Sequence, residues 1–470
     1  MTHNSRYDSL PVSLEEVLAG RDCRARRQGE LLSRYRGLDP SGKDLSLLSL
    51  SLNIPGEYKR FPLADRSFHE ELRILRLSLE AEKIPLIHEE SSETRAGYTG
   101  FIVAGGSPER LKKLAENIED THSLGRLFDI DVLKPDGSKL SRLEGKARPC
   151  LICGNPGFIC ARSRAHSPEE LIRRVIGLME QFTRERLGDI VSSAALRALL
   201  GEAAVTPKPG LVDRANSGAH SDMDFFSFID SAAALLPWFR HCALEGYKSA
   251  GPSGGGMDPE TLFRSLRPGG KTAELLMRRA AGTNTHRGLL FSLGILSAAY
   301  GRLYRECEAP AAVSLLDFAA KMTVSLGDDF SAPNPAPSHG ELVYAKSGVT
   351  GIRGEAAAGF PTVRNWGLPV LRRLLAEGFG MNDAGLGTLL HLMAHTEDTN
   401  IIHRAGGSGL EAVRAETAAF LAGNPGMEEM KETAAGMDRD FSARNISPGG
   451  AADLLAVSIF LHVLDIHAPA

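Results

Sequence analysis

Cysteine is scarce in this sequence, and it has no apolar run long enough to cross a membrane. Six cysteines in 470 residues are too few for a disulfide scaffold. The first residues contain no apolar stretch of the length that a secretory signal needs. The longest apolar run, AADLLAVSIFLHVL near the end, is too short to span a bilayer and predicts a buried helix. We therefore expect a cytoplasmic protein that does not bind membranes.

The sequence also has no excess of basic over acidic residues. The chain has 54 Lys and Arg against 58 Asp and Glu, a formal net charge of −4. This balance gives no basic footprint for nucleic acid, so any anion must be bound at local sites. The apolar fraction of 43% is ordinary and allows a large core. The length predicts two or three domains.

The first part of the chain alternates between helical and strand patterns. Ser13 and Glu16 have capping-box spacing, and Ser107 followed by Pro108 is a typical helix start. Strand patterns occupy residues 48–53, 97–106 and 127–141, the last as strand, turn and strand. We predict an α+β domain with a small sheet over residues 1–182.

The second part of the chain has a different pattern. From about residue 183 onward, long segments with a helical apolar period, rich in Ala, Leu and Gly, follow one another, and convincing strand patterns are nearly absent. No Pro/Gly-rich linker marks the change. We predict that residues 183–470 form one all-α domain whose loops carry the polar motifs.

The stretch GRLFDIDV places two carboxylates in a predicted strand. Asp129 and Asp131 are two positions apart, so they share a face with about 6.5–7 Å between their Cα atoms. Such a pair can bind Mg²⁺ for displacement at phosphorus. Gly125 lets a phosphate approach the backbone, Arg126 can bind it with two hydrogen bonds, and Lys59 is a further cation. The alternative is an edge strand whose polar face happens to be acidic.

Half of the cysteines lie within eleven residues. Cys150, Cys153, Cys160 and His166 have the spacing C-x2-C-x6-C-x5-H. Three thiols and an imidazole are a possible tetrahedral Zn²⁺ set, and the site would be structural. The alternative is a group of small buried thiols beside a surface histidine.

Five loop segments of the helical part combine cations with carboxylates or amides. In the first, Lys208 is held between two prolines, and Asp213 and Asp222 offer oxygen ligands. In the second, His286 and Arg287 open an apolar helix, where free N–H groups favour an anion. The other three contain Arg353, Glu355, Glu397, Asp398, Asn400, His403, Arg404, Asn445 and Asp453. Capping and turn chemistry explains each segment alone, but together they predict a pocket for Mg²⁺ and a nucleotide.

Several of these segments resemble known signatures. TPKPGLVDRANSGAHSDM, GTNTHRGLLFSLG, EDTNIIHRAGG and NISPGGAADLL resemble triphosphoribosyl-dephospho-CoA synthase, over about residues 196–465. GRLFDIDVL and RPCLICGNPGFICARSRAH resemble apo-citrate lyase phosphoribosyl-dephospho-CoA transferase, over about residues 10–180. The resemblance implies a bifunctional enzyme that makes and attaches the citrate lyase prosthetic group. It also implies a nucleotidyltransferase-like first domain. Glu397 departs from the synthase pattern, in which we expect a glycine.

The resemblance implies two reactions, both with Mg²⁺. In the first, ATP and 3′-dephospho-CoA give 2′-(5″-triphosphoribosyl)-3′-dephospho-CoA and adenine. In the second, a serine of the apo acyl carrier subunit attacks the innermost phosphate of that product, and pyrophosphate leaves. Asp129 and Asp131 suit the second reaction.

The first reaction needs phosphate-binding groups, stabilisation of a positive centre, a base and an acid. The phosphate-binding residues we expect are Lys208, Arg214, His286, Arg287, Asn400 and Arg404. The carboxylates for Mg²⁺ or for the developing positive charge are Asp213, Asp222 and Asp398. Glu355 or Asp398 is the expected base, and His220 or His403 the expected acid.

Three other functions compete with this one. The equivalent activities for malonate decarboxylase differ only in the carrier protein. A Mg²⁺-dependent ADP-ribosyl hydrolase uses similar loops in a helical fold but takes water as the acceptor. A zinc-stabilised interaction protein predicts bound metal without turnover, and it leaves the helical motifs unexplained.

Overall fold

The structure is a computed structural model that describes residues 11–35, 45–143, 145, 147–251, 255–307, 309–326 and 339–466, without the side chains of 339–341. The chain divides into two compact units, residues 1–185 and 186–470, which we call the N-terminal unit and the helical unit. The division falls inside one long helix, α5 (Pro168–Ala204). Its beginning packs in the N-terminal core through Val175 and Met179, and its later turns belong to the core of the helical unit.

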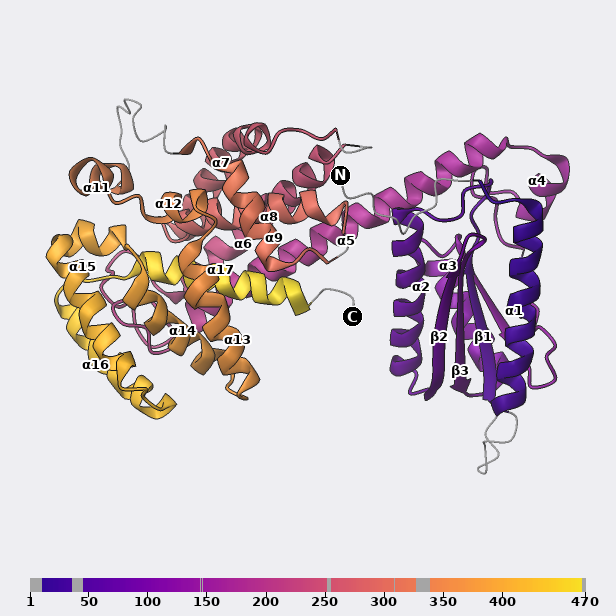
Figure 1. The fold of residues 1–470 in the computed structure, drawn as a ribbon, viewed down its shortest axis with the longest axis horizontal. Coiled ribbons are helices and arrows are strands. Elements are labelled where there is room, and N and C mark those ends of the chain that lie inside the picture. Colours follow the sequence, from indigo (N-terminus) through magenta and orange to yellow (C-terminus); the bar gives the residue numbers. More distant parts are fainter. Residues whose placement is uncertain are drawn as a thin grey trace. The chain divides into compact units, whose positions relative to one another are not determined.

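The N-terminal unit contains a four-stranded antiparallel sheet with the order β2-β3-β1-β4. Its strands are β1 (Leu45–Leu52), β2 (Leu86–Thr94), β3 (Gly97–Gly105) and β4 (Phe128–Leu133). Helices α2 (Pro62–Ala81) and α3 (Pro108–Thr121) cover one face, and α1 (Leu14–Tyr35) lies on the other (Figure 1). The short α4 (Gly157–Ser163) precedes α5.

The alternating strand pattern explains the two faces of this sheet. Leu48 and Leu50 of β1 pack with Phe68 of α2 in the larger core, whereas Leu47 points to the other face and contacts Leu31 of α1. This alternation follows from the two-residue period of a strand. The predicted helix starts are confirmed as well, because the Ser13–Glu16 capping box forms both of its hydrogen bonds. The α+β prediction therefore holds for this unit.

Two strand predictions differ from the structure. Strand β2 was not predicted, because most of its residues are exposed and it lacks the apolar alternation of a covered strand. It is held by pairing with β3 and by the ion pair of Arg27 with Glu90, 2.6 Å apart. The strand predicted after the 134–137 turn was wrong, since only a single bridge between Leu133 and Lys139 forms there.

The described part of the helical unit contains helices and no strand, as predicted. After α5 come α6 (Phe225–Ser249), α7 (Pro259–Ala281), α8 (Arg287–Tyr304), α9 (Ala312–Met322), α11 (His339–Ser347), α12 (Gly351–Ala357), the π-helix η1 (Val363–Gly367), α13 (Leu368–Ala376), α14 (Met381–His395), α15 (Thr399–Ala422), α16 (Met427–Ala443) and α17 (Gly449–Ile466).

Helix α17, yellow in Figure 1, is packed against α8, α13 and α14. It is long and apolar enough to cross a membrane, but 67% of it is buried inside the protein. The prediction of a buried helix is therefore confirmed. Helices α6 and α8 touch through glycine: a Cβ on Gly246 would lie 2.0 Å from the carbonyl oxygen of Ala298. This close approach packs α8 tightly against α6, and the polar motifs gather at the start of α8.

Candidate functional site

A cavity of about 1080 Å³ lies in the helical unit. The loop that follows α5 meets the N-termini of α8, α15 and α17 there. Free backbone N–H groups at helix N-termini favour anions. Seven of the residues to which the sequence assigns a catalytic or binding role line this cavity: Lys208, His220, His286, Arg287, Glu355, Asn400 and Arg404. Arg353, Glu397 and Asp453, from the same predicted loop segments, line it as well.

Two acidic residues of the cavity lining, Glu202 and Asp453, interact with each other. Glu202, on α5, is buried and pairs with the Lys208 ammonium at 2.5 Å. Asp453, on α17, stands against Gly288, where a Cβ would lie 1.8 Å from its Oδ2. Burial raises the pKa of Asp453 well above its usual value, and the charges of Glu202 and Asp398 add to this rise. Sequence reasoning missed Glu202, because it sits in an ordinary helical run.

Lys208 therefore differs from its expected role. Its Nζ also donates to the backbone oxygen of Glu202 at 2.9 Å, and its side chain is 1% exposed. A cation held in this way compensates a buried carboxylate and is not available as a free phosphate ligand. Its ammonium is the charge partner of the buried Glu202 carboxylate beside the cavity.

The segment that opens α8 presents polar atoms that have no partner within the protein. Asn284 Oδ1, Thr285 Oγ1 and His286 Nε2 are buried without a hydrogen bond, and all three residues line the cavity. His286 Nδ1 lies 2.7 Å from Ser231 Oγ. Burial, with the nearby charge of Lys208, lowers the pKa of His286 to about 3, so it is a neutral imidazole and not the expected cation. Buried polar atoms are rarely left unpaired, so this segment is suited to contacting a ligand.

Cations gather on one side of the cavity. We call these five residues the basic cluster: Arg267, Lys271 and Arg278 of α7, Arg287 at the start of α8, and Arg353 of α12. Arg278 and Arg287 both pair with Glu274, at 3.0 and 3.3 Å. Burial and the neighbouring Arg353 lower the pKa of Arg267, which shows that like charges crowd here. The three cations of α7 were missed because they resemble a solvated helix face in the sequence.

Glu355 is a third acidic group at the cavity. It accepts hydrogen bonds from Thr362, one from the hydroxyl and one from the backbone N–H at 3.2 Å. Burial raises its pKa, and the nearby Glu397 adds to the rise. A carboxylate with a raised pKa beside a cavity is suited to general acid–base chemistry.

His220 and Arg404 link three loops at the cavity edge. His220 Nε2 lies 2.9 Å from Ser447 Oγ, and its Nδ1 lies 3.3 Å from Arg404. Arg404 also donates to Asn445 Oδ1 at 2.6 Å. Burial and the charge of Arg404 lower the pKa of His220, which favours the neutral ring.

Asp398 does not have the catalytic position that we expected. Its Oδ1 accepts from the N–H groups of Asn400 and Ile401 at 2.9 and 3.3 Å, and its Oδ2 accepts from Ala451 at 3.0 Å. It is 2% exposed and is not part of the cavity lining. Burial raises its pKa to about 6. Asp398 therefore caps α15 and ties it to the start of α17, which positions Asn400.

Asp213 likewise serves its own loop instead of a metal ion. Its Oδ1 accepts from the backbone N–H groups of Ala215 and Asn216 at 2.7 and 3.0 Å, and its Oδ2 accepts from Lys208 N–H at 3.0 Å. The residue is 2% exposed. Both oxygens are used to fold the loop around Lys208.

Three further expected residues lie outside the cavity lining. Arg214 is exposed and donates to Asn382 Oδ1 at 2.9 Å. Asp222 is exposed and accepts from the Thr283 hydroxyl at 2.7 Å. His403 is exposed on α15. The loops that carry them shape the cavity, but these side chains do not reach it in this structure.

A second cavity, of about 590 Å³, lies between α1 and the sheet of the N-terminal unit. Asp129 and Lys59 line it together with Arg21 and Arg24 of α1 and with Ser51, the β1 residue opposite Asp129. Arg24 donates to Ser51 Oγ at 2.9 Å. Burial and the charge of Arg21 lower the pKa of Lys59. Glu90, which pairs with Arg27, is a second carboxylate of the lining, and two carboxylates among several cations suit a phosphorylated ligand.

The other two residues predicted with Asp129 lie elsewhere. Asp131 shares its strand face but pairs with Lys139 at 2.5 Å and does not line the cavity. Arg126 has Arg148 and Cys150 as charged neighbours, and its Nε and Nη1 are buried without a hydrogen bond. Burial, with the charge of Arg148, lowers its pKa.

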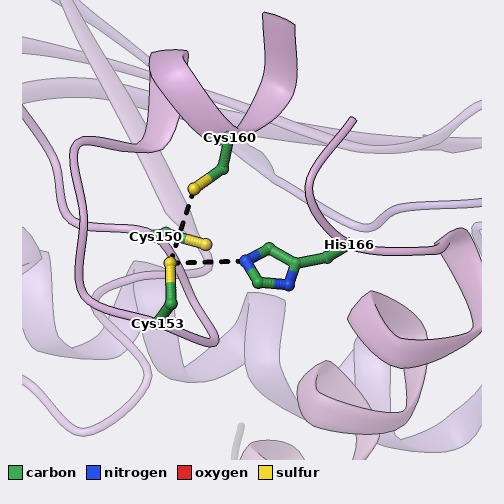
Figure 2. Close-up of side chains that lie close together, drawn as sticks. All are labelled: Cys150, Cys153, Cys160 and His166. Atoms are coloured by element: carbon green, nitrogen blue, oxygen red, sulfur yellow. Dashed lines mark hydrogen bonds between the residues drawn. The ribbon is translucent and has the colours of Figure 1, made fainter. Parts of the chain in front are cut away.

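The cysteine motif forms one cluster. Figure 2 shows Cys150, Cys153, Cys160 and His166 pointing toward a common centre, and their ligand atoms all lie within 4.8 Å of one another. Hydrogen bonds from the Asn155 backbone and from His166 lower the pKa of Cys153 to about 6. The contact with Cys153 raises the pKa of Cys160 to about 12.

Comparisons with known proteins divide the chain in a similar place. A family model described as ATP:dephospho-CoA triphosphoribosyl transferase matches residues 189–469. A second family model, described as apo-citrate lyase phosphoribosyl-dephospho-CoA transferase, matches residues 12–182.

Individual relatives cover both parts. The chain is 33% identical to Protein CitXG of Haemophilus influenzae over 467 residues, which is 96% of each chain. It is 32% identical to Protein CitXG of Leuconostoc mesenteroides subsp. cremoris over 96% of this chain and 97% of that protein. It is 42% identical to the 2-(5''-triphosphoribosyl)-3'-dephosphocoenzyme-A synthase of Klebsiella pneumoniae, over 58% of this chain and 89% of that protein.

Proposed function

Because the chain belongs to the ATP:dephospho-CoA triphosphoribosyl transferase family and also carries an apo-citrate lyase phosphoribosyl-dephospho-CoA transferase domain, we propose that its two cavities are the two active sites. The helical unit makes 2′-(5″-triphosphoribosyl)-3′-dephospho-CoA from ATP and 3′-dephospho-CoA and releases adenine. The N-terminal unit transfers the phosphoribosyl-dephospho-CoA group to the acyl carrier subunit of apo-citrate lyase and releases pyrophosphate.

One observation carries the assignment of the helical cavity: the five cations of the basic cluster line the same cavity as the carboxylates Glu202, Glu355 and Asp453. The basic cluster binds the triphosphate of ATP, which stays intact in this reaction. Arg278 and Arg287 share a single carboxylate, Glu274, so their charge is only partly compensated within the protein. Asn284 Oδ1 and Thr285 Oγ1, which have no hydrogen bond within the protein, then contact the nucleotide.

The carboxylates act at the ribose of ATP. As the bond between C1′ and adenine breaks, positive charge grows on the ribose, and the carboxylate group of Glu202 stabilises it. Asp453 keeps its proton because of burial and gives it to the departing adenine. Glu355 accepts the proton of the dephospho-CoA 2′-hydroxyl as its oxygen bonds to C1′. Asp453 and Glu355 thus take opposite roles: Asp453 donates a proton and Glu355 accepts one.

In the N-terminal cavity, Arg21, Arg24 and Lys59 bind the phosphates of the intermediate. The carrier serine oxygen forms a bond with the innermost phosphorus, and the bond to the next phosphate breaks. Asp129 receives the serine proton, and it is the residue that would hold a divalent metal ion, which would supply positive charge for the phosphates. The nucleotidyltransferase-like character of this unit is part of the proposal, and it is supported by the carboxylate on a strand beside the phosphate-binding cations.

The magnesium expectation fits one unit better than the other. In the N-terminal unit, Asp129 lines the cavity, and Mg²⁺ commonly binds through one carboxylate and substrate phosphates. When bound, the ion would neutralise charge on the pyrophosphate. In the helical unit, Asp213 and Asp222 do not fit, because the first is used by its loop and the second lies outside the cavity lining.

The first test is adenine release from ATP by the full-length protein, measured by chromatography with and without 3′-dephospho-CoA. We expect release only with dephospho-CoA, and a strong loss of release in Asp453→Asn. Asp230→Asn, an exposed carboxylate on α6, is the matched control and should release adenine normally. Release without dephospho-CoA, or an unchanged rate in Asp453→Asn, would contradict the proposal.

A further inference from the structure

The cysteine cluster has no part in either reaction, and its geometry is that of a metal site. Cys153 Sγ lies 3.4 Å from Cys160 Sγ and 3.3 Å from His166 Nε2. In a tetrahedral zinc site with Zn–S bonds of about 2.3 Å, neighbouring ligand atoms lie about 3.4–3.8 Å apart. The four side chains converge in Figure 2 as such a site requires.

The backbone around the first two cysteines supports this geometry. Ile152 N–H donates to Cys150 Sγ at 3.5 Å, and Cys150 N–H donates to the Asn155 oxygen at 2.6 Å. Gly154 has a φ of +74°, which lets the chain turn back sharply after Cys153. The loop therefore presents both thiols to one side and directs an N–H toward a sulfur, which stabilises a thiolate.

A disulfide explains the cluster less well. Three thiols and an imidazole meet, and one disulfide would leave a thiol and the histidine without a role. All three cysteines are free in the structure. The distance between Cys153 and Cys160 is well beyond the roughly 2.05 Å of a sulfur–sulfur bond. Four ligands around one centre match the closed ligand set of a structural zinc site.

We propose that Cys150, Cys153, Cys160 and His166 bind one Zn²⁺ ion, which fixes residues 149–166 on the N-terminal unit. With four protein ligands the site is closed, so the ion has a structural role. The loop is also anchored by Leu151, which packs on the core and whose carbonyl accepts from Arg174 at 3.3 Å.

The ion also acts on the transferase cavity, if that cavity is the active site proposed above. Arg148 directly precedes the cluster, and its Nη2 donates to the carbonyl oxygens of Gly125 and Phe128, both at 2.8 Å. These contacts hold the start of β4, and Asp129 is the next residue. Loss of the ion should therefore displace Asp129 and slow carrier modification, while the helical unit is unaffected.

The test uses full-length protein purified without chelators. We expect about one zinc per chain by elemental analysis, and we expect Co²⁺ added to the apo protein to give the absorption of tetrahedral thiolate coordination. Cys153→Ser should lose the zinc and the cobalt spectrum, and it should become sensitive to proteolysis within residues 149–166. Cys307→Ser, an exposed cysteine of the helical unit, is the matched control and should keep all three properties.

Activity separates this proposal from the proposed function. In Cys153→Ser, carrier modification should fall about ten- to a hundredfold while adenine release stays normal. If the wild-type protein binds zinc but carrier modification is unchanged in Cys153→Ser, the link to Asp129 is wrong although the site exists. If the wild-type apo protein binds neither Zn²⁺ nor Co²⁺, or if a disulfide is found between these cysteines, the metal site itself is refuted. The cobalt titration needs no variant, so misfolding of Cys153→Ser cannot obscure that result.

Discussion

Replacing Gly288 by alanine tests whether the position of Asp453 matters for adenine release. Gly288 lies in the first turn of α8, and a Cβ there would stand 1.8 Å from Asp453 Oδ2. The clash involves a carboxyl group that we assign to catalysis, and the nearest clashing atoms are all in that one side chain. The substitution therefore moves Asp453 and leaves its chemistry intact.

The size of the effect follows from this distance. To reach an ordinary contact of 3.4 Å, the carboxyl oxygen has to move by about 1.6 Å. A misplacement of about 1 Å can cost about a hundredfold in rate, so we expect at least that loss in kcat for adenine release. Overpacking costs about 1–3 kcal/mol of stability, and alanine in a helix returns about 1 kcal/mol relative to glycine. The variant should therefore remain folded.

The assay is adenine release by the purified full-length protein, with circular dichroism to verify folding. Gly436→Ala is the matched control, because it places a methyl group within α16 where the nearest atom is 4.0 Å away. Carrier modification with pre-made intermediate should be normal in both variants. A folded Gly288→Ala protein with a wild-type rate of adenine release would refute the role of Asp453 at this position.

Five other substitutions test the remaining assignments. Lys208→Met should lower the free energy of unfolding by about 3–5 kcal/mol, because it leaves the buried Glu202 carboxylate without its charge partner. Adding Glu202→Leu should restore stability, measured by denaturant titration, but it should not restore adenine release. Between pH 6.5 and 3, His286 binds a proton in the unfolded chain but not in the folded chain. The free energy of unfolding should therefore fall on acidification by up to about 1.4 kcal/mol per pH unit. His286→Gln should make this pH dependence less steep. Asp129→Asn should abolish carrier modification, followed by mass spectrometry of the carrier, whereas Asp131→Asn should retain most of it; equal losses would show that both carboxylates act.

Local sequence patterns predicted most of the helices and strands, and the elements that they missed have a physical explanation. The Ser13 cap and the apolar period of the helical unit are encoded in neighbouring residues, and they were read correctly. Strand β2 was missed because an exposed edge strand has no apolar face and depends on its partner β3. The capping roles of Asp213 and Asp398 also depend on structure that the local sequence does not contain. A carboxylate in a loop fits the pattern of a metal ligand and that of a helix cap equally well until the backbone around it is known.

The two-part organisation, the family and the motifs that surround the cavities can all be predicted from the amino-acid sequence. These depend on periodicity and on the identity of short segments, which are local properties. Which side chains meet depends on the packing of distant helices. Glu202 and Asp453 are 251 positions apart and come together because α17 packs beside α5 and α8 in the core. Burial then raises the pKa of Asp453, since the pKa of a carboxyl group depends on neighbours that no single segment contains.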